Sequence, residues 1–174
     1  MGERTTRQVV GALENIFRDS ATKEQETMNE TKAIRIASVK YAGDFKLRLR
    51  WVNRSVTLVD LSESIHRLKG LQPLLDAEIF AKARKGEGGH SVTWPIEVDM
   101  GADRLWEMAL EQTGHHDTVE FLRWRWRYGL SLTDAANALG LSRRQIAYYA
   151  SGKHPVPRTV LLACKGWEAE RKAA

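Results

Sequence analysis

The residues best suited to chemistry are the run Ser142-Arg143-Arg144-Gln145, with Tyr148 one helical turn further on. An arginine guanidinium can donate to both O6 and N7 of guanine, and a glutamine amide can pair with N6 and N7 of adenine. We therefore predict that these five side chains contact DNA bases. The alternative for the arginines is phosphate contact without sequence readout, and for Tyr148 it is packing against the protein.

Other candidate groups lack the spacing that catalysis or metal binding requires. His115-His116-Asp117 are neighbours in sequence, which rarely converge on one ion, so we interpret them as a polar interdomain turn. The loop Gly86–His90 is rich in glycine but matches neither phosphate-binding glycine motif. Nothing in the spacing of His66 and His90 supports an acid–base pair. We predict no catalytic residue, no metal, no cofactor and no enzymatic activity.

Charge is distributed unevenly along the chain, whose net charge is +5. Residues 118–174 hold ten Lys and Arg against four Asp and Glu, a net charge of +6, whereas the first 117 residues have a net charge of −1. A local positive field of this kind attracts polyanions such as nucleic acid, although a merely soluble basic surface would give the same count.

Length and composition narrow the class of protein. The 174 residues, 43% of them hydrophobic, suit one medium domain or two small ones. The sequence has no apolar run of about 18 residues, and its N-terminus has no apolar signal region, so we expect neither a membrane span nor secretion. The single cysteine, Cys164, cannot form an intramolecular disulfide, which fits a reducing cytoplasm. We predict a cytoplasmic location.

Two short helices are predicted to position the arginines. Ser131 followed by Asp134 resembles a capping box, and Ser142 followed by Gln145 is a complete one, so helices should start at both serines. Gly140 lies between them, where the chain must turn sharply and a left-handed conformation favours glycine. A glutamine used in a capping box turns back toward the helix start, which is the alternative to base contact for Gln145.

Residues on either side complete a helical unit. Ala136 is small, as a close helix crossing requires. Gly152 should end the second helix, Pro157 should begin another, and Thr118 should cap a helix upstream. Apolar contacts between the two helices are predicted from Ala135, Leu139, Leu141, Ile146 and Tyr149.

Four further residues are predicted to contact DNA phosphates. Ser131 and Thr133 open the first helix, whose N-terminus is a natural phosphate site. Lys153 and His154 follow the second helix. Such contacts position a protein on DNA and make its binding salt-dependent, but they carry no sequence information.

Residues 118–172 resemble the phage-repressor (Cro/C1, Xre-like) family of helix-turn-helix domains. The resemblance rests on Gly129, Leu130, Ser131, Ala136, Leu139, Gly140, Ser142, Ile146, Tyr149, Gly152 and Pro157. It implies a bundle of four or five helices in which residues 142–151 form the recognition helix, in the major groove of double-stranded DNA. It also implies a homodimer on two half-sites about 34 Å apart. Tyr149 stands where that family often has tryptophan.

Residues 33–114 are predicted to form a small α+β domain with a mainly antiparallel sheet. Lys46–Trp51 alternates strictly, so one face carries Leu47, Leu49 and Trp51. Further strands are predicted over 34–39, 55–61 and 91–94, and helices over 76–83 and 101–112. The fold class is therefore an α+β domain followed by an all-α bundle.

This domain resembles domain-of-unknown-function family 2442. The resemblance rests on Val39-Lys40-Tyr41, Gly43-Asp44, Leu47, Leu49, Trp51, Asp60-Leu61, Phe80, Val92-Thr93-Trp94-Pro95, Asp99 and Leu105. It implies a four-stranded unit. Some members are encoded beside small toxins, so the alternative function is an antitoxin-like module that binds a small protein partner and regulates itself through DNA.

Residues 1–32 are predicted to form an amphipathic helix over Thr6–Asp19 and a polar linker, with a frayed tail as the alternative. Met28 is an alternative translation start, which would leave residues 1–27 outside the native protein. Together these observations predict a sequence-specific DNA-binding protein, a bacterial transcriptional regulator that acts as a homodimer.

Overall fold

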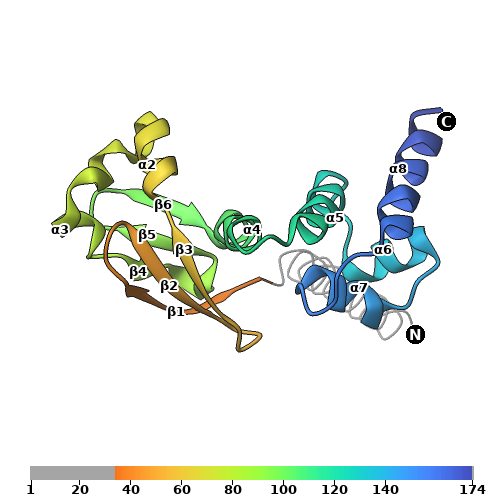
Figure 1. Ribbon diagram of the computed structural model, residues 1–174, viewed down its shortest axis with the longest axis horizontal. Helices are drawn as coiled ribbons and strands as arrows, with labels where there is room; N and C mark the ends of the chain where they lie inside the picture. The colour runs from red at the N-terminus through yellow and green to blue at the C-terminus, as the bar shows by residue number, and fades with distance from the viewer. Residues whose placement is uncertain (1–33, 174) are drawn as a thin grey trace, which may run out of the picture.

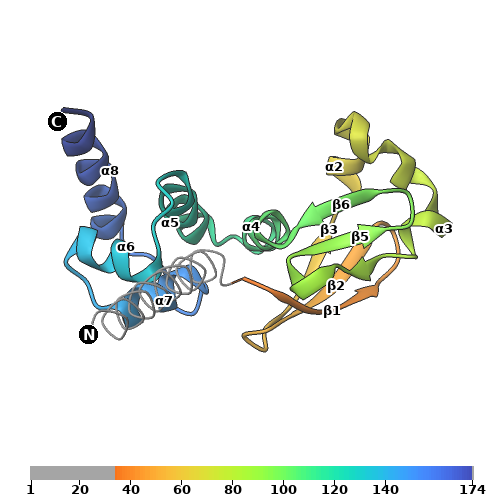
Figure 2. The same cartoon turned by 180° about the vertical axis from the view of Figure 1, so that it is seen from behind.

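The computed structural model describes residues 34–173, which form two lobes joined end to end (Figure 1). The α+β lobe comes first and the helical lobe follows, as Figure 2 shows from behind. This architecture confirms the predicted fold class of an α+β domain followed by a helical bundle. The predicted helix over residues 6–19 lies outside the described residues.

The first sheet contains β1 (Ile36–Tyr41), β2 (Lys46–Trp51) and β3 (Val56–Asp60), paired antiparallel in that order. Its buried face follows from the alternation in β2, since side chains two residues apart share a face of the sheet. Leu47 and Leu49 are fully buried. The predicted alternation and its apolar face are therefore confirmed.

The second sheet contains β4 (Arg84–Lys85), β5 (Ser91–Trp94) and β6 (Val98–Gly101), also antiparallel and in that order. The expected four-stranded unit is therefore wrong, because the described chain has two sheets of three strands. No pattern in the sequence indicated β4, which is two residues long, or β6. The turn before β6 places Glu97 in a left-handed conformation, with φ of 56°.

Short helices connect the two sheets. They are α2 (Ser62–Arg67), the 3₁₀ helix η1 (Lys69–Leu75) and α3 (Ala77–Phe80), while the 3₁₀ turn η2 (Glu87–Gly89) joins β4 to β5 within the second sheet. The helix predicted over 76–83 is shorter than expected. Its start is fixed by Asp76, whose carboxylate accepts hydrogen bonds from the backbone N–H of Glu78 (2.8 Å) and Ile79 (3.2 Å).

Helix α4 (Ala102–Gln112) lies between the lobes and packs against β3, β6 and the next helix. Its last residue, Gln112, pairs with the edge of the first sheet. The Gln112 side-chain oxygen accepts from Asp60 N–H (2.9 Å), and its amide donates to Asp60 C=O (2.7 Å). Because β3 is an edge strand, this amide takes the place that another strand would occupy.

Four helices build the second lobe, namely α5 (His116–Arg127), α6 (Leu132–Leu139), α7 (Arg143–Ala150) and α8 (Arg158–Ala173). The predicted cap at Thr118 is wrong, because α5 begins two residues earlier and Thr118 is fully buried. The polar segment before it has a structural role. The carboxylate of Asp117 accepts a hydrogen bond from Val156 N–H at 2.5 Å, which ties the start of α5 to the loop before α8.

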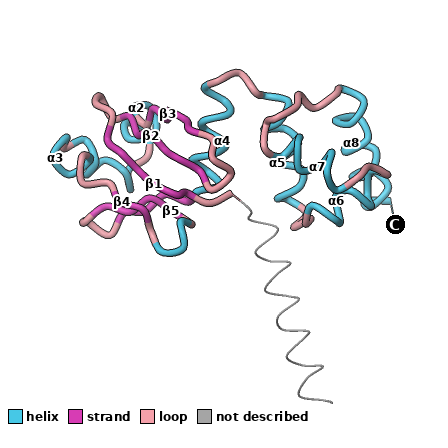
Figure 3. The backbone as a smooth tube through the Cα atoms, turned by 90° about the horizontal axis from the view of Figure 1, so that it is seen from below, coloured by secondary structure: helices cyan, strands magenta, loops and turns pink. Residues whose placement is uncertain are grey.

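The buried side chains form one continuous cluster through both lobes. On the α+β side, Trp51 and Trp106 meet edge to face with ring centroids 4.9 Å apart. On the helical side, Phe121 and Tyr149 meet in the same way at 6.0 Å. Figure 3 shows α4 and α5 side by side where the lobes join. Between residues 34 and 173, none of the helices is both long and apolar enough to cross a bilayer.

Candidate nucleic-acid interface

Helices α6 and α7 begin and end where the sequence predicts. Ser131 Oγ accepts from Asp134 N–H (3.0 Å), and the Asp134 carboxylate accepts from Ser131 N–H (3.2 Å). Ser142 and Gln145 form the same reciprocal box at the start of α7. Gly140 takes the left-handed conformation, with φ of 65°, in the turn between them. The capping residues and the turn glycine are therefore confirmed.

Helix α7 is amphipathic, and its packing determines which side chains reach solvent. Ile146, Tyr149 and Ala150 are buried against the lobe. Arg143 lies on the same side of the helix as Ala150 but is exposed in the first turn. Because successive residues are about 100° apart around a helix, Arg144 lies on the opposite face, and it is exposed. Tyr148 is also on this side and is half-buried. The alternative that Tyr148 belongs to the bundle core is not what the structure shows.

Three of the predicted DNA-contacting side chains gather around the phenol ring of a fourth, Tyr148. Arg144 Nε donates to Tyr148 Oη at 2.7 Å, and its guanidinium carbon lies 5.4 Å from the ring centroid. Lys153 Nζ lies 4.6 Å from the same centroid, and the His154 ring lies 4.9 Å away, edge to face. We call Arg144, Tyr148, Lys153 and His154 the Tyr148 cluster.

The cluster is electropositive enough to alter the titration of its phenol. The hydrogen bond from Arg144 lowers the pKa of Tyr148, and the charges of Arg144 and Lys153 add to this, although partial desolvation acts in the opposite direction. Arg144 and Lys153 thus place two positive charges beside one ring. The cluster can therefore attract an anion such as a phosphate group.

The other predicted DNA-contacting residues differ in their exposure and in their hydrogen bonds within the protein. Gln145 turns back to the helix start, since its Oε1 accepts from Ser142 N–H (3.3 Å) and Ser142 Oγ (3.1 Å). Ser131 is buried, and its hydroxyl donates to Asp134 at 2.6 Å. Thr133 is exposed near the start of α6. Within residues 34–173, no hydrogen bond or ion pair joins Ser131 or Thr133 to the Tyr148 cluster.

Several basic residues of the C-terminal third form ion pairs within the protein or are buried, so not all of the positive charge counted in the sequence is available to DNA. Arg127 pairs with Glu168 (3.5 Å) and Lys165 with Glu120 (2.9 Å). Arg125 is only 1% exposed, so it cannot meet a nucleic acid at the surface. Of the other basic residues in this third, Arg143, Arg144 and Lys153 are exposed on α7 and the loop after it, and Arg158, Arg171 and Lys172 are exposed on α8.

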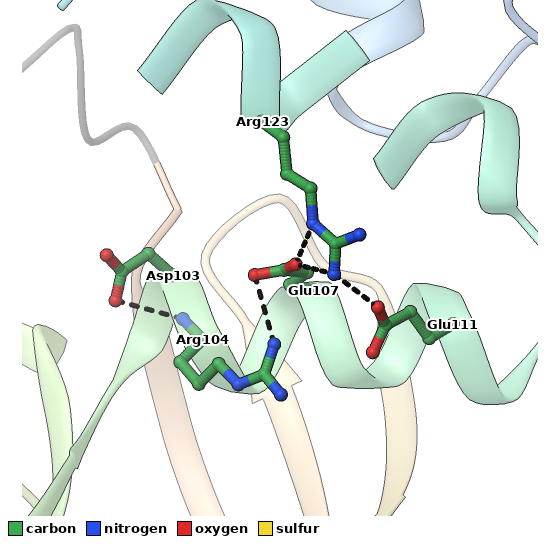
Figure 4. A network of polar contacts seen from close by, with 5 residues as sticks. All are labelled: Asp103, Arg104, Glu107, Glu111 and Arg123. Atoms are coloured by element: carbon green, nitrogen blue, oxygen red, sulfur yellow. Dashed lines mark hydrogen bonds and ion pairs between the residues drawn. The ribbon is translucent and has the colours of Figure 1, made fainter. Parts of the chain in front are cut away.

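Arg123 is engaged at the joint between the lobes (Figure 4). Its guanidinium forms ion pairs with Glu107 Oε1 and with Glu111 Oε1, the latter at 2.5 Å from Arg123 Nη2. Arg104 Nη1 contacts the other carboxylate oxygen of Glu107 at 3.2 Å. Burial acts against the charge of Arg123, but its hydrogen bonds and ion pairs with Glu107 and Glu111 outweigh burial and raise its pKa. We call these four residues the Glu107 cluster.

A second basic surface on the α+β lobe was missed in the sequence. Lys40, Arg48 and Arg50 are exposed on the outer face of the first sheet, where Lys40 pairs across the strands with Arg48. The signal was present, because the alternation that buries Leu47 and Leu49 must expose Arg48 and Arg50. A net charge summed over the first 117 residues concealed it.

The protein therefore belongs to the class of two-lobed proteins in which an α+β lobe is followed by a helical lobe, here with basic side chains on α7. The chain belongs to the same family as a protein of known crystal structure, with which it is 37% identical. The match covers 79% of this chain and 88% of the other, with a TM-score of 0.57. That relative is the "Putative DNA Binding Protein NE0471" of Nitrosomonas europaea ATCC 19718. Neither a family model nor a curated protein matches the chain.

Proposed function

We propose that this protein binds specific sequences of double-stranded DNA through α7 and regulates transcription. The observation that carries the proposal is the Tyr148 cluster, a group of basic and aromatic side chains on the exposed face of a short, capped helix and on the loop after it. The relative NE0471, named for DNA binding, supports the same role, as does the resemblance of residues 118–172 to phage-repressor helix-turn-helix domains.

In this proposal α7 enters the major groove with its N-terminal end at the base edges. Arg143 and Arg144 read guanine, and Ser142 and Tyr148 add contacts beside them. Gln145 reads adenine only if it leaves the capping box, because bidentate adenine recognition needs the same side-chain oxygen that now accepts from Ser142.

Phosphate contacts would then fix the position of α7 in the groove. Lys153 and His154 follow the helix and lie against Tyr148, so they are placed to hold the DNA backbone. Thr133 can contribute from the exposed start of α6. The hydroxyl of Ser131 is committed to its own cap, so Ser131 would contribute through the position of the helix end and not through its side chain.

Protein dimerisation follows from the same proposal, since domains of this type bind paired half-sites about 34 Å apart. Two copies of α7 would then lie in successive major grooves on one face of the duplex. Sedimentation of the protein alone and with a double-site duplex measures the stoichiometry directly.

The function is tested by fluorescence anisotropy with DNA from upstream of the gene, titrated with salt and with unrelated competitor. We expect the upstream DNA to be preferred by about 10³ or more. The variant Arg143→Ala/Arg144→Ala should lose that preference. The matched control is Arg171→Ala/Lys172→Ala, which removes the same charge from the exposed end of α8 and should retain it.

Two other outcomes have clear meanings. If the double variant weakens all DNA equally and reduces the salt slope by about one unit per lost contact, the arginines hold phosphates and α7 does not read sequence. If the protein binds no DNA at low salt, the proposed function is wrong, and the helical lobe is an interaction module for another protein.

A further inference from the structure

The first sheet exposes a line of basic side chains that reaches toward the helical lobe. Lys40 lies on β1, Arg48 and Arg50 lie on β2, and Arg54 lies in the turn between β2 and β3; all four are exposed. Arg48 and Arg50 share the outer face of the sheet, because side chains two residues apart in a strand point to the same side. Lys40 pairs with Arg48 across the strands. We call these four residues the basic track.

The basic track is not neutralised within the protein. In the part of the chain from residue 34 to residue 173, its side chains form no hydrogen bond or ion pair. The acidic side chain on this face of the strands is Asp60, which lies 3.9 Å from Lys46, its cross-strand partner. Like charges directly opposite each other destabilise a sheet, so the pairing of Lys40 with Arg48 is one that a bound anion would relieve.

The turn that carries Arg54 is held by hydrogen bonds. Trp51 N–H donates to Ser55 C=O at 2.9 Å, and Arg54 N–H donates to Trp51 C=O at 3.0 Å. Asn53 Oδ1 accepts from Ser55 N–H at 3.0 Å. Arg54 itself is left-handed, with φ of 70°, a conformation that residues other than glycine rarely adopt. The guanidinium of Arg54 is therefore presented from a fixed turn.

The basic track ends beside α7. Figure 1 shows the turn between β2 and β3 at the edge of the α+β lobe that is nearer the helical lobe. Asn53 in this turn lines the same pocket as Ala147 and Ser151, which belong to α7 and the residue after it. Lys153 of the Tyr148 cluster follows Ser151 by two residues. The basic track and the Tyr148 cluster are therefore neighbouring basic surfaces on the two lobes.

The side chains along β1 and β2 are of the kind that hold phosphates. Ser38 pairs with Arg50 as Lys40 pairs with Arg48, so the outer face of these two strands is polar and basic. Serine, lysine and arginine are among the residues that contact DNA phosphates most often. The exposed aliphatic side chains of this face, Val56 and Leu58, lie on β3, at the far side of the arginines.

We propose that the basic track binds the phosphate backbone of the DNA that flanks the α7 site. The inference rests on the proposed function, because it takes DNA to be the molecule bound at α7. A duplex is a continuous polyanion, so DNA seated on α7 extends beyond it. At about 3.4 Å per residue, the chain from Arg48 to the start of the turn at Val52 spans about 14 Å, the rise of about four base pairs. The contacts position the α+β lobe on DNA and read no sequence.

Salt titration of DNA binding by the full chain tests the basic track. Arg50→Gln/Arg54→Gln removes two of its cations. The matched control is Lys69→Gln/Lys82→Gln, which removes two exposed cations from η1 and from the residues after α3. Each phosphate contact contributes about 0.9 to the salt slope, so the track variant should lose about two units of slope on a duplex with flanks of about ten base pairs. Between about 50 and 200 mM salt, its affinity should therefore fall about tenfold less than that of the parent, and the control should match the parent.

Two further measurements separate the basic track from α7. The track variant should keep the preference for upstream DNA over unrelated competitor, because phosphate contacts carry no sequence information. In hydroxyl-radical footprinting, the parent should protect a flank of about four base pairs that the track variant leaves open, while both protect the same centre. Thermal melting confirms that the exposed substitutions leave the protein folded.

The proposal is overturned if the track variant keeps the salt slope of Lys69→Gln/Lys82→Gln on the flanked duplex. The basic track would then face another anionic partner, such as an acidic protein, although specific DNA binding through α7 would stand. A reduced slope in the track variant, together with no preference for upstream DNA in the parent, would uphold the basic track and reject the sequence-specific function. A protein that binds no DNA at low salt would overturn both.

Discussion

Two clusters of basic side chains in this protein have opposite surroundings. In the Tyr148 cluster, basic side chains gather around a phenol at the surface, so their charge is available to a partner. In the Glu107 cluster, two arginines converge on carboxylates at the joint between the lobes, where the Glu107 side chain is 11% exposed. An arginine is therefore open to a partner on α7 and bound to carboxylates at the joint, and the difference is whether carboxylates lie beside it.

Charge reversal in the two clusters should give the largest difference, measured as the free energy of unfolding. Glu107→Lys places a third cation against Arg104 and Arg123, and should lower the free energy of unfolding by about 3 kcal/mol or more. Arg144→Glu reverses a charge on the exposed face of α7 and should change it by less than about 0.5 kcal/mol. Urea denaturation measures both. Equal losses would show that the Tyr148 cluster also holds the fold.

DNA binding should respond in the opposite way. Arg144→Ala removes one guanidinium from the proposed base contacts and should weaken specific DNA binding roughly tenfold to hundredfold, the usual effect of one bidentate contact. Arg104→Ala removes an arginine from the Glu107 cluster and should leave affinity unchanged. Anisotropy at one fixed salt concentration compares the two. A similar loss in both variants would point to general charge instead of recognition.

The two caps extend the comparison to neutral side chains. Ser131 is buried, so Ser131→Ala removes, at a site closed to water, the hydroxyl that accepts from Asp134 N–H, and should cost about 2 kcal/mol. Ser142 is exposed, and Ser142→Ala should cost about 1 kcal/mol or less while it frees Gln145 from the box. Thermal melting ranks the variants, and the reverse order would contradict the burial argument.

The smallest effect should appear in the pH dependence of DNA binding. The pKa of Tyr148 is lowered, so its phenol ionises before an ordinary tyrosine as the pH rises toward about 10. The phenolate would repel phosphate and weaken binding by roughly two- to fivefold. Tyr148→Phe should lack this loss over the same pH range. If the DNA affinity of the parent protein falls no more than that of Tyr148→Phe as the pH rises, the phenol does not lie near DNA.

The local features of this fold were predictable from sequence. The capping boxes at Ser131 and Ser142, the turn at Gly140 and the alternation in β2 depend on residues within one turn or one strand of each other. All the residues that determine each of these features lie within one short segment of the sequence. The candidate site could be placed on α7 for this reason, since its amphipathic face follows from helical spacing alone.

Long-range pairing was not predictable in the same way. Arg123 and Arg125 counted equally toward the basic charge of the C-terminal third. In the structure, Arg123 binds Glu107, 16 residues earlier, and Arg125 is buried at the joint between the lobes. The difference depends on where α4 packs, and nothing in the segment around α5 specifies that. The two-residue strand β4 was missed for a similar reason, because it exists only through its pairing with β5.

The pairing of Gln112 with β3 has a consequence for synthesis of the chain. An edge strand offers open backbone groups to any extended segment nearby, which is a route to aggregation. Gln112 follows Asp60 by 52 residues, so at roughly 5–20 residues per second the ribosome needs about three to ten seconds to supply it. Throughout that interval the edge is open to neighbouring nascent chains. We therefore expect the soluble yield of this protein to depend on how quickly translation reaches the end of α4.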